Sequence, residues 1–355
     1  TETLLANLWR FEEAPWHEIV ATYAGSDDVY LRRAAAYSLS RTGADNARAA
    51  QRQLATDPEP VIRAFALRGF ERGTLDNDDL TVVQAALADP DWRVQSAACR
   101  VLAAQDPVGL EPEAAKIVAR AFTSPHPHLA VSAVAAAASQ PSIGDARGLL
   151  SIVGGDDPWL AAEALVALAK RDASTASMVA RRWFESDELW RRRAAARSAG
   201  DLGAEAEKLA AADAEPSVRL AWLSSLTDEG TAKRKNALIE MVENDPDPTV
   251  RTRILSLLRS AEVAPGVEKL VGLYAAWKSD VMPDARAEAL IAAVAASETT
   301  EERAGVIALG LSDRDPAVAA HLVNVARSLG MEATLPGREP RHGSLWYENL
   351  VDWVK

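Results

Sequence analysis

The stretch Asp245–Arg251 reads DPDPTVR, and degraded copies of it recur along the whole chain. With Asp245 as position 0, the equivalent positions are Ser26, Asp57, Asp89, Ser124, Gly155, Ser186, Asp213, Asp280 and Asp313. The mean spacing is about 32 residues, a period typical of helical repeat proteins. We therefore expect ten copies of one structural unit.

Each position of the unit carries residue types that suit one part of a helix. Proline is best tolerated as the first residue of a helix, and it stands at +3 in seven copies: Pro60, Pro127, Pro158, Pro216, Pro248, Pro283 and Pro316. Aspartate, a good N-cap, stands at +2 as Asp28, Asp91, Asp157, Asp247 and Asp315. Glycine suits the residue that ends a helix, and it stands at +17 as Gly43, Gly203, Gly230 and Gly330. The pattern predicts a helix that begins at +3 in each copy.

The string Asp-Pro-x-Pro-x-Val-Arg resembles the start of the second helix of HEAT repeats, and the resemblance covers residues 1–330. In that family the arginine at +6 pairs with acidic side chains of the inter-helix turns and forms a ladder along the solenoid. Six copies carry this arginine: Arg32, Arg63, Arg192, Arg219, Arg251 and Arg286. Four copies have Gln95, Ala130, Ala161 or Ala319 instead, so the ladder is expected to be broken in the middle and near the end.

The expected fold is all-α, a right-handed superhelical α-solenoid of about ten HEAT-like helix pairs with one concave and one convex face. Residues 1–330 are expected to form this solenoid, because repeat units bury their cores only against neighbours. Residues 331–355 are expected to be a linker and a short amphipathic C-terminal helix, either a cap or the lead-in to a further domain. Val250 and Ile254, at +5 and +9, are expected to be buried between repeats.

Composition argues against several classes of function. Lysine and arginine total 39 against 51 acidic residues, and the net charge of −12 disfavours nucleic acid and anionic lipid as partners. The single cysteine, Cys99, excludes an intramolecular disulfide and a thiolate-cluster metal site. Apolar runs are too short for a membrane span, and we expect no signal peptide ahead of the repeats. We expect a soluble protein, either cytoplasmic or exported with its signal peptide removed.

A second resemblance concerns the pattern that runs from Asp89–Val94 to Leu345–Glu348. It is similar to the HEAT region of certain bacterial proteins that carry a cyclophilin-type peptidyl-prolyl isomerase domain downstream. None of the cyclophilin motifs occurs in this sequence. The expected function is a non-enzymatic scaffold, a monomer without a cofactor, that binds a protein or an extended peptide. The alternative is the substrate-recognition arm of a multidomain isomerase whose catalytic domain lies outside this chain.

A helical wheel indicates where a partner would bind. Positions +5, +9, +12 and +16 cluster on the core side, and +7, +11 and +14 lie opposite, toward the concave face. The opposite row contains the candidate partner-binding residues Arg33, Tyr37, Arg68, Arg100, Arg193, Arg197, Arg259 and Arg327. It also contains Val131, Val166, Ile291 and Val294. This row favours an extended peptide with acidic groups, and the alternative is that the arginines only keep an alanine-rich surface soluble.

The aromatic residues have two possible roles, one structural and one in binding. Tyr30, Trp92, Trp159 and Trp190 stand at +3 or +4 and would either staple neighbouring repeats together or form an aromatic rim that grips a peptide. DNA glycosylases with HEAT-like repeats stack bases on tryptophan, but the acidic charge disfavours that use here. The motif His126-Pro127-His128 lacks the acidic or thiolate neighbours of a metal site and is expected to be a turn. No catalytic, metal-binding or cofactor-binding residue is predicted.

Overall fold

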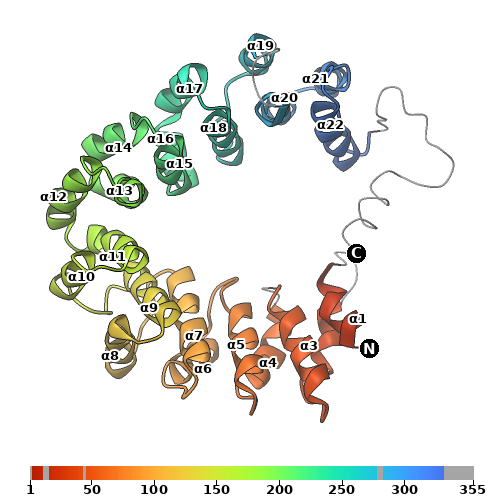
Figure 1. The fold of residues 1–355 in the computed structure, drawn as a ribbon. Helices are drawn as coiled ribbons and strands as arrows, with labels where there is room; N and C mark the ends of the chain where they lie inside the picture. Colours follow the sequence, from red (N-terminus) through yellow and green to blue (C-terminus); the bar gives the residue numbers. More distant parts are fainter. Residues whose placement is uncertain (1, 11–15, 43–44, 278–282, 332–355) are drawn as a thin grey trace. The chain divides into compact units, whose positions relative to one another are not determined.

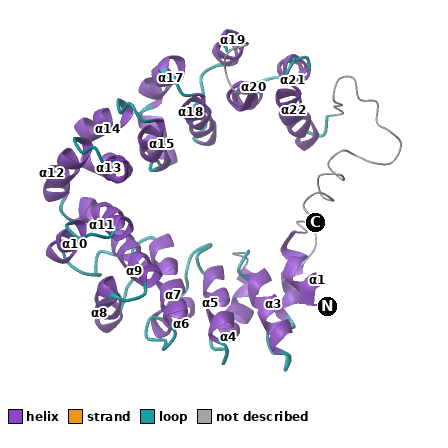
Figure 2. Ribbon diagram, viewed as in Figure 1, coloured by secondary structure: helices purple, strands orange, loops and turns teal. Residues whose placement is uncertain are grey.

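The computed structural model describes residues 2–10, 16–42, 45–277 and 283–331. These residues form α-helices and three short 3-10 helices, with no β-strand among them (Figure 2). Two compact units divide the chain, unit 1 at residues 1–210 and unit 2 at residues 211–355. The expected C-terminal linker and helix at 331–355 lie outside the described residues, apart from Met331.

Unit 1 contains α1, the helix pairs of the first six repeats and all of α14 except its last residue. The helices are α1 (Glu2–Asn7), α2 (Trp16–Ala21), α3 (Val29–Leu39), α4 (Arg48–Leu54), α5 (Pro60–Gly69), α6 (Asn77–Ala86), α7 (Trp92–Ala104), α8 (Pro112–Arg120), α9 (Pro127–Ser139), α10 (Ala146–Val153), α11 (Pro158–Arg171), α12 (Ala173–Phe184), α13 (Leu189–Leu202) and α14 (Ala204–Ala211), whose last residue begins unit 2. The 3-10 helices are η1 (Leu8–Arg10), η2 (Asp45–Ala47) and η3 (Ala121–Thr123). The second helices α3, α5, α7, α9, α11 and α13 pack side by side in that order (Figure 1).

Unit 2 continues the same alternation. Its helices are α15 (Pro216–Ser224), α16 (Asp228–Lys233), α17 (Lys235–Asn244), α18 (Pro248–Ser260), α19 (Val267–Ala276), α20 (Pro283–Ala296), α21 (Thr300–Leu311) and α22 (Pro316–Ser328). Here α15, α18, α20 and α22 pack in order as second helices. The described helices form ten first-and-second pairs in chain order, as the ten copies of the sequence unit predict. The prediction of an all-α solenoid of about ten HEAT-like helix pairs is confirmed.

The start of each second helix follows the sequence pattern closely. All seven prolines at +3 are the first residue of their helix. Five aspartates at +2 accept hydrogen bonds from backbone N–H groups of the first turn, so each one fills its predicted N-cap role: Asp28, Asp91, Asp157, Asp247 and Asp315. These caps satisfy donors that a helix leaves unpaired at its N-terminus. One local device therefore fixes where each second helix begins.

The expected glycine stops are only partly present. Gly203 and Gly330 have positive φ, 94° and 71°, and end α13 and α22 as predicted. Gly230 instead lies inside α16, because α15 already ends at Ser224 and Thr227 caps a new helix. The prediction for Gly230 is therefore wrong. Gly43 lies outside the described residues.

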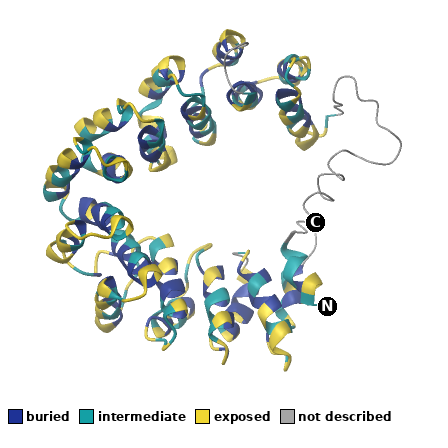
Figure 3. Cartoon of the chain, viewed as in Figure 1, coloured by how far each residue is buried: buried dark blue, intermediate teal, exposed yellow. Residues whose placement is uncertain are grey.

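The core lies between the helix layers of each unit, and alanine and branched aliphatic residues dominate it (Figure 3). Val250 and Ile254 are fully buried, which confirms their assignment to the core face of α18. Val131, Val166 and Ile291 are half-buried, but Val294 is buried. The prediction that Val294 belongs to the exposed row is wrong, because +14 of α20 faces the core.

The arginine ladder joins each repeat to the next one. Four rungs link an arginine at +6 to an aspartate near position 0 of the next repeat: Arg32 to Asp57 at 2.6 Å, Arg63 to Asp89 at 2.8 Å, Arg219 to Asp245 at 2.8 Å, and Arg286 to Asp313 at 3.5 Å. The guanidinium groups of Arg32, Arg63 and Arg219 also donate to backbone carbonyls of their own turn, as Arg219 does to Asp213 O at 2.7 Å. Arg251 differs, because its guanidinium lies over the Trp277 ring, 5.1 Å from the centroid.

A second set of bonds joins the repeats in the middle of unit 1. Gln105, Gln140 and Arg171 all stand at +16, near the C-terminal ends of their helices. Each side chain reaches back to carbonyl oxygens of the preceding repeat: Gln105 to Phe70 at 3.3 Å, Gln140 to Leu102 at 2.8 Å, and Arg171 to Ala137 at 2.8 Å. These three repeats are the ones whose +6 residue is Gln95, Ala130 or Ala161. At the α7–α9 and α9–α11 junctions, which have no arginine rung, the opposite ends of the helices are tied instead.

Truncation of a core side chain tests the register of the repeats. Ile254→Ala should lower the free energy of unfolding by about 2–5 kcal/mol, because it leaves a cavity between packed helices. Urea denaturation measures this loss, and Ser260→Ala at the exposed end of α18 is the matched control. An unchanged midpoint for Ile254→Ala would contradict the burial of position +9.

Removal of one partner of a buried arginine–aspartate pair should lower the free energy of unfolding by an amount similar to that of Ile254→Ala. The side chains of Arg219 and Asp245 are only 6% and 3% exposed. Asp245→Ala should destabilise the protein by about 3–5 kcal/mol, because it leaves the buried guanidinium without its counter-charge. Glu229→Ala, which breaks the exposed Lys233–Glu229 pair, should leave the denaturation midpoint unchanged. Equal losses for the two variants would show that the rung contributes no more than a surface pair.

Candidate functional site

The eight candidate partner-binding residues all lie on second helices. Arg33 and Tyr37 are on α3, Arg68 on α5, Arg100 on α7, Arg193 and Arg197 on α13, Arg259 on α18, and Arg327 on α22. Five of the arginines in unit 1 are exposed, and Tyr37 is half-buried. We call the solvent-facing side of α3, α5, α7, α9, α11 and α13, at positions +4, +7, +11 and +14, the second-helix face of unit 1.

Carboxylates neutralise several of these arginines. Arg100 pairs with Glu71 at 3.0 Å, Arg197 with Glu163 at 2.7 Å, Arg259 with Glu288 at 2.9 Å, and Arg33 with Glu2 at 3.4 Å. Glu163 and Glu288 come from the neighbouring second helix, and Glu71 lies in the turn that follows α5. Sequence reasoning missed them because the wheel of one helix does not show what the next helix places opposite it.

Three of the eight residues keep their charge free for a ligand. Arg68, Arg193 and Arg327 are exposed, and none of them forms an ion pair with another described residue. Arg68 lies 5.7 Å from the centroid of the Phe65 ring, which holds the guanidinium beside an aromatic surface. The second-helix face is thus less cationic than the sequence suggests, with its free charge concentrated at a few positions.

Arg68 and Arg100 lie together at a hollow in the second-helix face. This α5–α7–α9 groove has a volume of about 410 Å³ and is lined by Val61, Ala64, Phe65, Arg68, Trp92, Arg93, Ser96, Ala97, Arg100, His128 and Ser132. Several of these residues are small, and Ser96 Oγ and Ser132 Oγ share a hydrogen bond of 2.9 Å between α7 and α9. Because these hydroxyls are already bonded, the groove offers a ligand chiefly rings and guanidinium groups.

The aromatic walls of the groove are held in place by neighbouring rings. Trp92 stacks on His126 of the next repeat, with centroids 5.0 Å apart and planes 13° apart, and on His128 at 6.2 Å. Phe65 meets Tyr37 of the preceding repeat edge-on at 5.6 Å. The two histidines therefore do more than form a turn: His126 is the N-cap residue of α9, and both rings brace Trp92.

The prediction that the aromatic residues at +3 and +4 join neighbouring repeats holds at some positions only. Trp92 links two repeats through the histidine stack, and Trp190 contacts Trp183 of the same pair at 5.3 Å. Trp159 and Tyr30 are instead 73% and 56% exposed, so they staple nothing. These two rings extend the second-helix face on either side of the groove.

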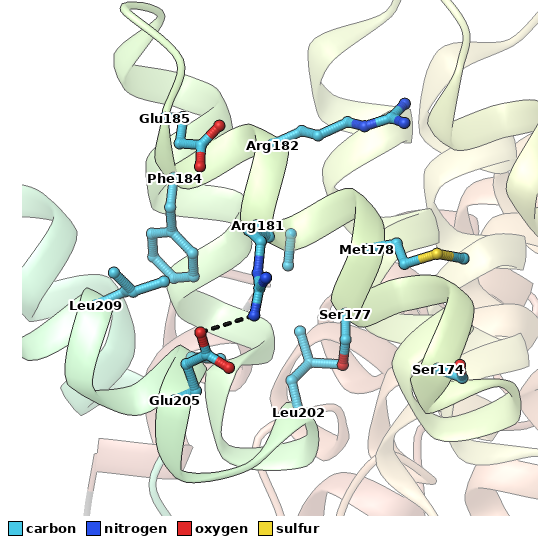
Figure 4. A pocket seen from close by; sticks show the side chains of 12 residues that line it. Ser174, Ser177, Met178, Arg181, Arg182, Phe184, Glu185, Leu202, Glu205 and Leu209 are labelled. Carbon is cyan, nitrogen blue, oxygen red and sulfur yellow. Dashed lines mark hydrogen bonds and ion pairs between the residues drawn. The ribbon is translucent and has the colours of Figure 1, made fainter.

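A larger hollow lies between α12 and α14, with a volume of about 640 Å³ (Figure 4). The Arg181–Glu205 ion pair, 2.7 Å long, crosses it, and Phe184 and Leu209 face each other at one end (Figure 4). The charges that line its centre are thus satisfied by each other. It lies on first helices, away from the predicted residues, and sequence reasoning did not indicate it.

Three further properties of the described ranges concern metal binding, membrane spans and the single thiol. No group of three or more His, Cys, Asp or Glu residues there could hold a metal ion. None of the helices described is both long and apolar enough to cross a membrane. Burial raises the pKa of the Cys99 thiol to about 12, so this thiol stays protonated and a poor nucleophile at neutral pH.

Comparison with known proteins agrees with the helix pairs seen here. A family model described as HEAT repeats matches residues 49–139, the stretch that forms α4 to α9 and contains the groove. HEAT repeats are thus identified in this part of the chain. No curated protein matches the sequence. The resemblance to cyclophilin-linked proteins stays a prediction.

Several solved structures are similar at low identity. An engineered protein shares 18% identity over 89% of this chain and 99% of its own, with a TM-score of 0.41. A Kap121p mutant shares 14% identity over 90% of this chain, with a TM-score of 0.37, and this chain spans 42% of its length. A homology model of the full-length AP-3 complex shares 11% over 92% of this chain and 71% of its own, with a TM-score of 0.45.

The reactivity of Cys99 tests whether α7 is packed as described beneath the groove. Cys99 is buried next to Arg100, and its raised pKa leaves almost no thiolate at pH 8. Ellman's reagent should therefore react with the native protein at least about a hundredfold more slowly than with the protein unfolded in guanidinium chloride. Prompt reaction of the native protein would show that α7 opens readily.

Proposed function

We propose that this chain is a non-enzymatic scaffold that binds a protein or an extended peptide on the second-helix face of unit 1. The observation that carries the proposal is the α5–α7–α9 groove, where three guanidinium groups and two braced aromatic rings converge. Aromatic and arginine side chains are the residues that contribute most to binding energy in protein interfaces. Helical repeats supply a long surface of this kind, because equivalent side chains recur on neighbouring helices.

The ion pairs on the second-helix face indicate which of its arginines are available to bind a ligand. Arg100 and Arg197 already contact carboxylates of their own chain, so a ligand must compete for them. Arg68 on α5 and Arg193 on α13 carry the free charges of the face and are the stronger candidates. An acidic group on the ligand would meet them without displacing an existing pair. We therefore expect acidic groups on the partner.

Site-specific photo-crosslinking in the source organism tests the face. A benzoylphenylalanine residue in place of Arg68 or Arg193 should form covalent adducts with a partner protein, because both positions are exposed on second helices. The same residue in place of Arg182, exposed on the first helix α12, is the matched control and should form none. The measurement is mass spectrometry of the adducts.

The same experiment can contradict the proposal. Adducts from position 182 alone would move the partner to the first helices. Adducts in equal yield from all three positions would indicate random collision rather than a binding face. Either result would remove the second-helix face as the functional surface.

A further inference from the structure

The α5–α7–α9 groove is lined by aromatic and cationic groups from three repeats. Phe65 and Arg68 come from α5, Trp92, Arg93 and Arg100 from α7, and His128 from α9. Both rings that form the walls are fixed by contacts with neighbouring repeats. A surface that is already rigid loses little conformational entropy when it binds. The groove is therefore suited to a ligand that is itself preorganised.

The spacing of the helices selects one backbone conformation for such a ligand. Packed helices lie about 8–10 Å apart. A polyproline II segment rises about 3.1 Å per residue with three residues per turn, so every third side chain returns to the same side after about 9 Å. A β-strand alternates its sides at each residue, so every third side chain points away from the groove. Of these two extended conformations, only polyproline II places every third side chain over a successive second helix.

The charges of the groove define what those side chains should be. Arg93 pairs with Asp91 and Arg100 with Glu71, each at 3.0 Å, and Arg68 forms no ion pair with a described residue. Three guanidinium groups thus face two carboxylates, and the groove is locally positive on a chain of net charge −12. At physiological salt, charges more than about 8 Å away are largely screened, so a ligand in the groove responds to the local charge.

We propose that the α5–α7–α9 groove binds an acidic, proline-rich segment of a partner protein in the polyproline II conformation. The inference rests on the proposed function, because it names the ligand class for the same face. Prolines pack against Phe65 and Trp92, in the way that aromatic-lined grooves receive proline-rich segments. An acidic residue in each turn lies toward the guanidinium groups, with Arg68 as its free partner.

Fluorescence anisotropy with three synthetic peptides and the full chain tests the ligand class. The peptides are labelled four-fold repeats of Glu-Pro-Pro, of Glu-Gly-Ser with the same charge but a flexible backbone, and of Lys-Pro-Pro with the opposite charge. The Glu-Pro-Pro peptide should bind at least about tenfold more tightly than either of the others, since it alone combines the preformed helix with charge-assisted contacts.

Matched variants tie this binding to the groove. Arg68→Glu and Trp92→Ala should each weaken binding of the Glu-Pro-Pro peptide by about tenfold or more. Arg182→Glu makes the same charge change on α12, and Met178→Ala removes an exposed apolar side chain from the same first helix, so both should leave the affinity unchanged. Trp92→Phe keeps an aromatic ring at this position and should retain most of the affinity. This result would show that Trp92→Ala weakens binding because the ring is lost and not because the protein misfolds.

Each contrary result has a distinct meaning. Equal binding of the Glu-Gly-Ser peptide would overturn the polyproline II conformation and leave the proposed scaffold function intact. Equal loss from Arg182→Glu and Arg68→Glu would reduce the effect to bulk charge and overturn the groove as the site. Failure of all three peptides to bind would overturn the ligand class, and the crosslinks from positions 68 and 193 would still decide the scaffold function.

Discussion

The bond between an arginine at +6 and an aspartate of the next repeat is the interaction on which the architecture depends. A helix pair on its own exposes one apolar face, so it is stable only when the next pair covers that face in the right register. The guanidinium group of Arg219 contacts both its own turn and Asp245, and it therefore links the position of one turn to the next. The aspartate in turn accepts the backbone N–H of Asp247, the N-cap of α18. Helix start and repeat stacking are thus fixed by one connected group of bonds.

The middle of unit 1 reaches the same stacking by different chemistry. Donor and acceptor of the ladder disappear together there, since Ser124, Gly155 and Ser186 replace the aspartate where Gln95, Ala130 and Ala161 replace the arginine. The long polar side chains at +16 then bond to the carbonyl ends of the preceding helices. Burial lowers the pKa of Arg171 there, because its guanidinium is desolvated among carbonyl oxygens. The stack of Trp92 on the two histidines lies at the N-terminal ends of α7 and α9, at a junction without an arginine rung.

Much of the fold could be predicted from the sequence, because its signals are local. Proline at +3 and aspartate at +2 act within one turn of helix, and every instance did what its chemistry dictates. Predictions that depended on a neighbouring helix were weaker. The partners Glu71, Glu163 and Glu288 could not be read from a single helical wheel, and neither could the burial of Val294. The groove was missed in part because Phe65 stands at +8, outside the row that the wheel selected, although an aromatic residue three places before Arg68 was a readable signal.

The bonds of Gln105, Gln140 and Arg171 have a consequence for how the protein responds to acid. Each rung of the arginine ladder needs an ionised carboxylate, and protonation of that carboxylate removes the attraction. A carbonyl oxygen does not titrate, so the bonds that these three side chains make keep both partners at low pH. Acidification therefore acts unevenly along unit 1, with the junctions around α3 and α5 weakened while α7, α9 and α11 stay tied together. The central repeats are the part of this unit best able to outlast a fall in pH, and the wall of rings that they carry would persist with them.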